Sequence, residues 1–347
     1  MTERTLNRRS FIKLCALAAG SLAFRQFDPA ADGFSNDSLG RVAIHSVSVY
    51  KEPNDKSQII CQRYRDELLN LYYEVVSKDG PGYNPRWYRV WQGYVHSAHI
   101  ERVWVRPNPI PKTAPEKPVL AEVTVPFSQT QRLIYTGKWE PVYRLYYGST
   151  HWIVGLDPGP DGEPWYRLKD ELLEVEYHVP AAHLRVIPLE EMAPISPDIP
   201  PQKKHIEVSL QSQTLVAYEY DQVVLQTKIS SGIPGQKPSP TGIPTKTPTG
   251  TFHIENKMPS KHMGDGNLTS DIEAYELPGV PWTSFFEMKT GVAFHGTYWH
   301  DNFGMMMSHG CVNMRSSEAK WIFRWSTPAP DPTQTSTIGY GTYVVVK

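Results

Sequence analysis

One cysteine with histidines close before it is the feature of this sequence that could do chemistry. Cys311 follows Gly310 directly. Three histidines come shortly before it: His295, His300 and His309. A thiol becomes a good nucleophile as a thiolate, and a neighbouring imidazole can take its proton to form a reactive ion pair. Gly310 would let backbone N–H groups approach a developing oxyanion without a Cβ in the way. The segment therefore predicts a cysteine acyl-transfer site.

Two other interpretations fit the same residues. Cys311 could be a buried structural thiol, and the residues considered alone do not separate that role from a nucleophile. The three histidines and Cys311 could also ligate zinc. However, the sequence lacks the Cys-x-x-Cys and His-Glu-x-x-His spacings of common zinc sites, so we expect neither a metal nor another cofactor.

A longer pattern surrounds the cysteine. His295-Gly296 is followed by Ser308-His309-Gly310-Cys311-Val312-Asn313, and Trp299 comes four residues after the first histidine. Thr247-Pro248-Thr249-Gly250-Thr251-Phe252 lies upstream, and the sequence closes with Gly341-Thr342-Tyr343-Val344-Val345-Val346. Over about residues 203–347 this pattern resembles the L,D-transpeptidase (YkuD-type) catalytic domain. Members of that family join peptidoglycan stem peptides.

The resemblance implies the main catalytic roles. Cys311 would attack the carbonyl between the third and fourth residues of a stem peptide, release D-alanine and hold the donor as a thioester. A thiol suits two-step transfer because it attacks well and leaves well. His295 would be the general base, oriented by the backbone carbonyl of Gly296.

The residues directly before the nucleophile would support it. The backbone N–H groups of Gly310 and Cys311 would stabilise the oxyanion. His309 would position the loop or assist the oxyanion site, although sequence alone does not rank two histidines near one thiol. Ser308 would fix the turn through its side chain. His300 matches no position of the family's motif, and we expect it to be a solvated loop residue.

Substrate-binding residues are expected around the same segment. Asn313 stands at a position of the family's motif. Aromatic side chains in a wet cleft pack on methylenes and offer polar edges, which makes Tyr275, Tyr298 and Trp299 candidates for the substrate wall. For Trp282 a core position is at least as good an interpretation. Arg315 would bind a stem carboxylate or, in the interpretation we favour, pair with Glu318.

Short alternating runs, 31 prolines and many Trp and Tyr residues (10 and 19) predict a mainly β fold. Residues 40–104 resemble a bacterial SH3-like domain. A weak repeat of the motifs at 85–90 and 98–103 in 164–168 and 182–186 predicts a second such unit at 118–188. Proline-dense segments separate these two small barrels from each other and from the catalytic domain at 203–347, for which one or two short helices are expected. The clearest helix begins near Ser316 and ends near Trp325.

Residues 1–38 read as an export signal and linker. Asn7-Arg8-Arg9-Ser10-Phe11-Ile12-Lys13 precedes a short apolar run and resembles a Tat-type signal. The run is about half the ~20 residues of a membrane span. We therefore expect export to the cell envelope or beyond, with membrane contact only through this signal. Of the other two cysteines, Cys15 lies in the signal. A disulfide between Cys61 and Cys311 would consume the nucleophile, so we expect this disulfide to be absent.

The formal net charge of −1 gives no indication of nucleic-acid binding. Together these features predict an exported L,D-transpeptidase that forms 3→3 peptidoglycan cross-links, with stem peptides as partners and carbapenems as inhibitors. Two alternatives stay open. One is an L,D-carboxypeptidase, in which water resolves the thioester at the same site. The other is a non-catalytic wall-binding protein whose SH3-like units do the binding.

Overall fold

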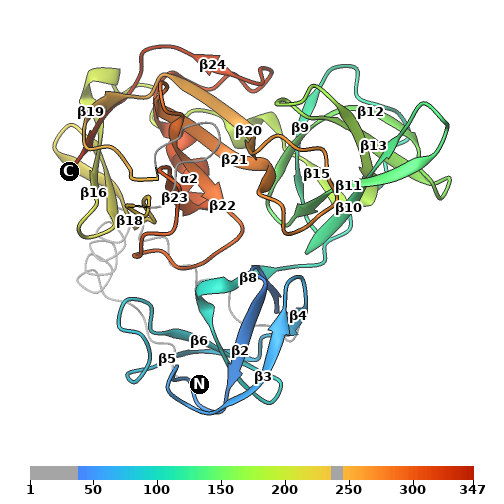
Figure 1. Cartoon of the computed structure of the whole chain (residues 1–347). Helices are drawn as coiled ribbons and strands as arrows, with labels where there is room; N and C mark the ends of the chain where they lie inside the picture. Colours follow the sequence, from blue (N-terminus) through green and yellow to red (C-terminus); the bar gives the residue numbers. More distant parts are fainter. Residues whose placement is uncertain (1–37, 236–244) are drawn as a thin grey trace, which may run out of the picture.

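The computed structural model describes residues 38–235 and 245–347, which form sheets in three successive parts of the chain. Figure 1 shows the first part in blue at the bottom, the second in green at the right, and the third from yellow to red. The predicted export signal falls almost wholly in residues 1–37, outside the described residues. Within the described residues, no helix has the length and apolar character needed to cross a membrane.

The first part, which we call the N-terminal unit, covers residues 38–104 and contains two sheets. One has the order β4-β1-β8, and the other has the order β3-β2-β7-β6-β5. Their strands are β1 (Leu39–Val42), β2 (Ser46–Tyr50), β3 (Ile59–Tyr64), β4 (Leu68–Asn70), β5 (Tyr73–Val76), β6 (Arg86–Val90), β7 (Gly93–His96) and β8 (Ile100–Val103), with the 3-10 helix η2 (Ser97–His99) between the last two. Both sheets contribute apolar side chains to one small core, which includes Val49, Tyr88 and Ile100.

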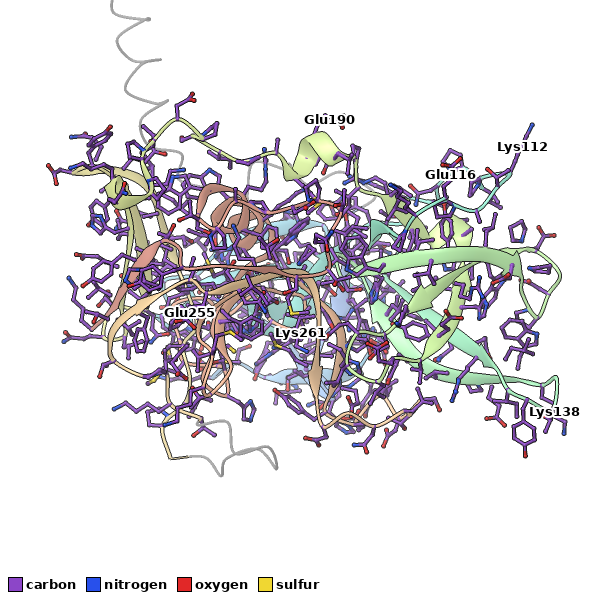
Figure 2. All side chains as sticks on the ribbon, turned by 90° about the horizontal axis from the view of Figure 1, so that it is seen from above. Lys112, Glu116, Lys138, Glu190, Glu255 and Lys261 are labelled. Carbon is purple, nitrogen blue, oxygen red and sulfur yellow. The ribbon has the colours of Figure 1, made fainter. Side chains whose placement is uncertain are left out.

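The second part, the middle unit, covers residues 118–188 and forms one seven-stranded sheet of order β11-β10-β14-β13-β12-β9-β15. Its strands are β9 (Val119–Val123), β10 (Phe127–Leu133), β11 (Trp139–Tyr146), β12 (Thr150–Pro158), β13 (Pro164–Lys169), β14 (Glu176–Pro180) and β15 (Leu184–Val186), with η3 (Ala181–His183) before β15. Figure 2 shows Lys138 at the outer tip of the β10–β11 hairpin, pointing away from the rest of the molecule.

The weak repeat in the sequence corresponds to matching elements in these two units. Its first motif forms β6 in one unit and β13 in the other, and its second forms η2–β8 and η3–β15. In both units the last strand pairs antiparallel with the first, β8 with β1 and β15 with β9. The repeat therefore marks two units with related connections. None of the sheets closes on itself within the described residues, so the SH3-like assignment stays a prediction.

The third part, the C-terminal unit, follows the short 3-10 helices η4 (Leu189–Met192) and η5 (Pro201–Lys203). It contains two five-stranded sheets, of order β18-β17-β16-β25-β19 and β23-β22-β21-β20-β24. The strands are β16 (Lys204–Ser209), β17 (Thr214–Glu219), β18 (Gln222–Lys228), β19 (Gly250–His253), β20 (Asn256–Gly264), β21 (Glu276–Glu287), β22 (Val292–Thr297), β23 (Val312–Arg315), β24 (Thr337–Ile338) and β25 (Tyr343–Val346).

One α-helix, α2 (Ser316–Trp325), occurs in the described residues, where the sequence predicted it. It follows β23 directly and buries Ala319, Ile322 and Phe323 on one face. These side chains join the largest core of the molecule, together with Trp282, whose ring centroid lies 5.5 Å from that of Phe323. Trp282 is thus a core residue. The prediction of a mainly β fold with few helices is confirmed.

The three units meet at a buried arginine. Arg41, from β1, is 1% exposed and donates to Asp66 (2.8 Å), to Glu101 (2.8 Å) and to the carbonyl of Tyr298 in the C-terminal unit (3.1 Å). Arg144 of the middle unit donates to the other oxygen of Asp66 at 2.6 Å. A guanidinium can remain charged at such a site because its donors are paired with carboxylates and a carbonyl.

Two further contacts fix the N-terminal unit to the C-terminal unit. Asp301 donates its backbone N–H to the carbonyl of Ala98 at 2.8 Å. The Asp301 carboxylate accepts from Arg86 at 2.8 Å and lies 3.7 Å from Nε of Arg315. The segment between His295 and Cys311 therefore packs against a unit from the other end of the described chain.

Replacing Arg41 tests how much this junction stabilises the fold. Arg41→Met leaves the buried Glu101 without its cation and Asp66 with Arg144 alone, so we expect the free energy of unfolding to fall by about 3 kcal/mol. Urea unfolding measures the change. Arg63→Met is the control, because Arg63 makes a partly exposed pair with Glu67 at 3.5 Å, and its loss should cost no more than about 0.5 kcal/mol. Equal losses for the two variants would contradict a stabilising role for the buried cluster.

Candidate active site

Parallel pairing of β22 and β23 brings the two halves of the cysteine motif together. The register aligns Phe294 with Val312 and His295 with Asn313. Cys311 is the residue immediately before β23, so it lies at the strand end next to the His295 strand. The spacing of about a dozen residues between the two motif halves is the length of the loop that joins these two parallel strands.

The loop before the cysteine is held by the hydroxyl of Ser308. This hydroxyl donates to the Cys311 carbonyl at 2.5 Å and accepts from the Gly310 N–H at 3.2 Å. The backbone of Ser308 also bonds to the segment that follows β18, donating to Ser231 and accepting from Ile233. Ser308 therefore has the contacts needed to fix the turn.

Thr247 is a second residue that holds this loop, and sequence reasoning gave it no role. Its buried hydroxyl accepts from the Gly232 N–H at 2.8 Å and donates to the Gly310 carbonyl at 2.7 Å. A Cβ at position 232 would lie 2.8 Å from the Gly310 backbone, which is too close. The close approach of these two segments therefore requires glycine at position 232. The upstream Thr-Pro-Thr-Gly motif was the signal that could have shown this role.

His295 is oriented as a base by its own neighbour. It is 2% exposed, and Nδ1 lies 3.0 Å from the Gly296 carbonyl. A carbonyl only accepts, so Nδ1 carries the proton and Nε2 keeps its lone pair. Burial lowers the pKa of His295 to about 4, against which the Gly296 hydrogen bond acts. The ring is therefore a neutral acceptor at neutral pH.

The thiol of Cys311 is neutral as well. Burial raises its pKa to about 11, although the Ala293 backbone acts in the opposite direction. Its Sγ lies 3.7 Å from the Gly291 carbonyl. The thiolate–imidazolium pair that the sequence suggested is therefore not the resting state, because burial disfavours the charged form of both groups.

His309 and Tyr275 lie on the open side of the cysteine. His309 is exposed, and its ring centroid lies 5.5 Å from that of Tyr275. Tyr275 is 45% exposed. Its pKa is raised to about 12, first by burial and then by the negative charge that Cys311 carries when it ionises. Both side chains thus lie at the protein surface near Cys311, and a substrate wall that includes Tyr275 stays a prediction.

His300 is not the solvated loop residue that the sequence suggested. It is 4% exposed, and its Nε2 lies 2.9 Å from Nδ2 of Asn313, while its Nδ1 accepts from the Asn302 backbone at 3.2 Å. Asn313 is itself 1% exposed and exchanges two backbone hydrogen bonds with Ser230. Asn313 therefore supports the loop from below, and its burial argues against the direct substrate contact predicted for it.

Two other residues considered for substrate binding are also held by the protein. Tyr298 is 4% exposed, and its hydroxyl donates to the Pro278 carbonyl, so it packs at the junction of the units. Arg315 makes the favoured contact with Glu318 at 3.5 Å, and its guanidinium lies over the ring of Phe303. Trp299 is partly exposed, with its ring centroid 5.8 Å from that of His295, and is the one of these three that borders the histidine.

Neither of the cysteines in the described part of the chain is in a disulfide. Cys61 lies far from the site, with its Sγ 3.8 Å from Gln92 of the same unit. Among these residues, no group of three or more His, Cys, Asp or Glu side chains is arranged to hold a metal ion.

Fold and site together define a β-rich domain that presents a cysteine beside a buried, oriented histidine. Residues 203–346 match the family model of the YkuD L,D-transpeptidase catalytic domain. This part of the chain belongs to that family. A comparison with curated proteins finds no match.

Several solved structures are similar to the chain. The catalytic domain of the E. faecium L,D-transpeptidase acylated by ertapenem is 30% identical, with 42% of this chain and 98% of that chain covered and a TM-score of 0.29. A mutant of the Enterococcus faecium L,D-transpeptidase is 28% identical, with 42% and 50% covered and a TM-score of 0.30. An L,D-transpeptidase from Mycobacterium smegmatis is 16% identical, with 72% and 92% covered and a TM-score of 0.32. The chain thus spans about half the length of the Enterococcus faecium mutant.

Replacing Thr247 tests its hold on the nucleophile loop. Thr247→Val leaves the Gly232 N–H and the Gly310 carbonyl without a partner, so we expect the free energy of unfolding to fall by about 2 kcal/mol. Hydrogen exchange should accelerate at residues 231–233 and 308–311. Thr251→Val, at an exposed position of β19, is the control and should change neither quantity. Unchanged exchange in Thr247→Val would show that the loop is held by other contacts.

The pH dependence of thiol reactivity tests the neutral pair. In a Cys61→Ser background, alkylation of Cys311 by iodoacetamide should rise about tenfold per pH unit from pH 7 to 10, because the reactive thiolate forms with a pKa of about 11. Mass spectrometry of the alkylated protein gives the rate. A rate that is already maximal and flat between pH 5 and 8 would indicate a preformed ion pair instead.

Proposed function

We propose that the protein is an exported L,D-transpeptidase that forms 3→3 peptidoglycan cross-links through a thioester on Cys311. The observation that carries the proposal is the position of Cys311, at the end of β23 beside the strand of His295, inside the segment that matches the catalytic-domain family. The Nδ1 contact to Gly296 supports His295 as the base, because it leaves Nε2 free to accept a proton.

In the first step, Cys311 attacks the carbonyl between the third and fourth residues of a donor stem. Because both groups rest neutral, the thiol proton passes to His295 as the carbon–sulfur bond forms, and no stable ion pair precedes the attack. The carbon–nitrogen bond then breaks, and the D-alanine amine takes the proton from the imidazolium. The products are a thioester, free D-alanine and a neutral His295.

In the second step, the side-chain amine of an acceptor stem attacks the thioester. His295 accepts the amine proton and returns it to the departing sulfur, so the enzyme ends in its starting state. Backbone N–H groups before β23 stabilise the oxyanion in both steps. Because the Gly310 N–H already donates to Ser308, we assign the larger share to the Cys311 N–H.

Three more features belong to the proposal. The Tat-type sequence at residues 7–13 would direct export of the folded protein. The N-terminal and middle units would hold the enzyme on the cell wall. Carbapenems are expected to acylate Cys311, and the similarity to a catalytic domain acylated by ertapenem supports this expectation.

Intact mass spectrometry tests the reaction. The mature protein and its Cys311→Ala variant are incubated with a tetrapeptide stem fragment. We expect an adduct and D-alanine release for the first protein only, with the variant unchanged in its unfolding transition. Adding an acceptor stem then separates cross-linking from the hydrolysis of an L,D-carboxypeptidase.

Two results would overturn the proposal. D-alanine release by folded Cys311→Ala would show that the cysteine is not the nucleophile. If the folded protein with a reduced thiol gives neither adduct nor release, the alternative of a non-catalytic wall-binding protein would be favoured.

A further inference from the structure

A cavity lies outside the cysteine site, where the three units meet. Its volume is about 530 Å³, which includes space open to solvent. The N-terminal unit contributes Arg41 and Arg65, and the middle unit contributes Tyr143, Arg144 and Tyr146. The C-terminal unit closes it with residues 269–278, except 273 and 275, and with Tyr298 and Trp299. Since no single unit forms it, the cavity is a property of the assembled chain.

Two arginines in its wall retain free donors. Arg65 donates through Nη2 to Glu273 at 2.9 Å, and Arg144 donates through Nη1 to Asp66 at 2.6 Å. The Nε atom of each of these two guanidinium groups is buried and has no hydrogen-bond partner among the described residues. Arg41 differs, because Asp66, Glu101 and the Tyr298 carbonyl already occupy it. Arg65 and Arg144 are thus the cations that a ligand could engage.

The hydroxyl of Tyr143 is another hydrogen-bond donor that has no acceptor among the described residues. Tyr143 is 2% exposed, lines the cavity and has no hydrogen-bond partner for its Oη among the described residues. A buried polar group without a partner is uncommon in native proteins and calls for an explanation such as a bound ligand or water.

The acceptors in the wall are largely in use. The Glu276 carboxylate accepts from His262 at 2.9 Å and from the backbone N–H of Asn267 at 2.6 Å. Asp271 accepts from the Glu273 backbone at 2.9 Å. Because the unpaired groups are donors, the wall suits a ligand that brings acceptors, and two guanidinium groups with free N–H edges suit a carboxylate.

The cavity shares its wall with the cysteine site. Trp299 lines it, and the Trp299 ring also lies beside the His295 ring. Ala274 and Glu276 line it too, and they flank Tyr275, which borders His309 and Cys311. A peptide held in the cavity therefore lies close to His295 and Cys311. The aromatic side chains of Trp299 and Tyr275 stand between the cavity and these two reacting groups.

We propose that this cavity binds the terminal carboxylate of the acceptor peptide, with Arg65 and Arg144 as its ligands. The inference rests on the proposed function, since a transpeptidase has to hold a second peptide. The Glu273 side chain is half-exposed, so its ion pair with Arg65 contributes little to stability. An incoming carboxylate can therefore replace Glu273 at low cost in free energy. Arg65 would then read the acidic end of the acceptor while Cys311 holds the donor.

Binding without turnover tests this assignment. In the full chain with Cys311→Ala, isothermal titration calorimetry compares a tetrapeptide stem with its C-terminal amide. We expect the free acid to bind about tenfold more tightly than the amide, which is the effect of one charge-assisted contact. Arg65→Gln should abolish the preference. Glu273→Gln, which removes the competing carboxylate, should increase it.

Arg63→Gln is the matched control, because Arg63 belongs to the same unit, is similarly exposed and is absent from the cavity wall. It should keep the full preference for the acid. Equal binding of acid and amide, or a preference that survives Arg65→Gln, would overturn the assignment. Donor acylation of the protein with its native cysteine separates the two proposals: its absence would refute the proposed function and leave the carboxylate preference to be decided by titration.

Discussion

The parallel pairing of β22 with β23 is the constraint on which the active site depends. It aligns His295 with Asn313 and leaves Cys311 at the strand end, where its thiol can be approached. The segment after β18 fixes the other side, through two backbone bonds between Ser230 and Asn313. The beginning of β23, next to the nucleophile, is therefore clamped between β22 and this segment. Such a clamp can hold a reacting geometry that a free loop could not.

The same clamp has an electrostatic consequence. It buries His295 and the surroundings of Cys311, so neither charged form is favoured and the pair rests as thiol and imidazole. A neutral thiol reacts slowly with oxidants, because oxidants react with the thiolate form. For an enzyme proposed to work outside the cytoplasm, this state protects the nucleophile until a substrate carbonyl arrives. The reaction then depends on proton transfer during attack, for which the fixed Gly296 contact orients the base.

Sequence alone predicted the mainly β fold and the helix from Ser316 to Trp325, because strand alternation and the helix start are local signals. It also identified the motif residues and the Gly296 carbonyl as the partner of His295, through the family resemblance. It could not place Asn313 or Tyr298, which make contacts distant in sequence, or His300, which is buried beside Asn313. The Tyr298 carbonyl, for example, accepts from Arg41, 257 positions earlier. When a residue is buried by a partner in another unit, the neighbouring sequence contains no pattern that predicts the burial.

The pKa values of the pair were missed for a related reason. A cysteine beside histidines in sequence suggests an ion pair, whereas the pKa of each group depends on how much water the fold removes from it. The β22–β23 clamp buries His295 to 2% exposure, and this is a property of the packed sheets rather than of the motif. The motif therefore specifies which groups react, and the packing determines their protonation at rest.

The N-terminal unit contacts the segment of the catalytic domain that lies between His295 and Cys311. Arg41 holds the carbonyl of Tyr298, and Ala98 and Arg86 hold Asp301. These contacts all fall in the stretch that leads from His295 towards Cys311. Asp301 also lies near Arg315, at the end of β23, so one carboxylate links Arg86 of the N-terminal unit to the strand that follows Cys311. A shift of this unit would move the backbone on which the base and the nucleophile depend. The N-terminal unit and the backbone between His295 and Cys311 are therefore joined by a buried guanidinium, an ion pair and a backbone hydrogen bond.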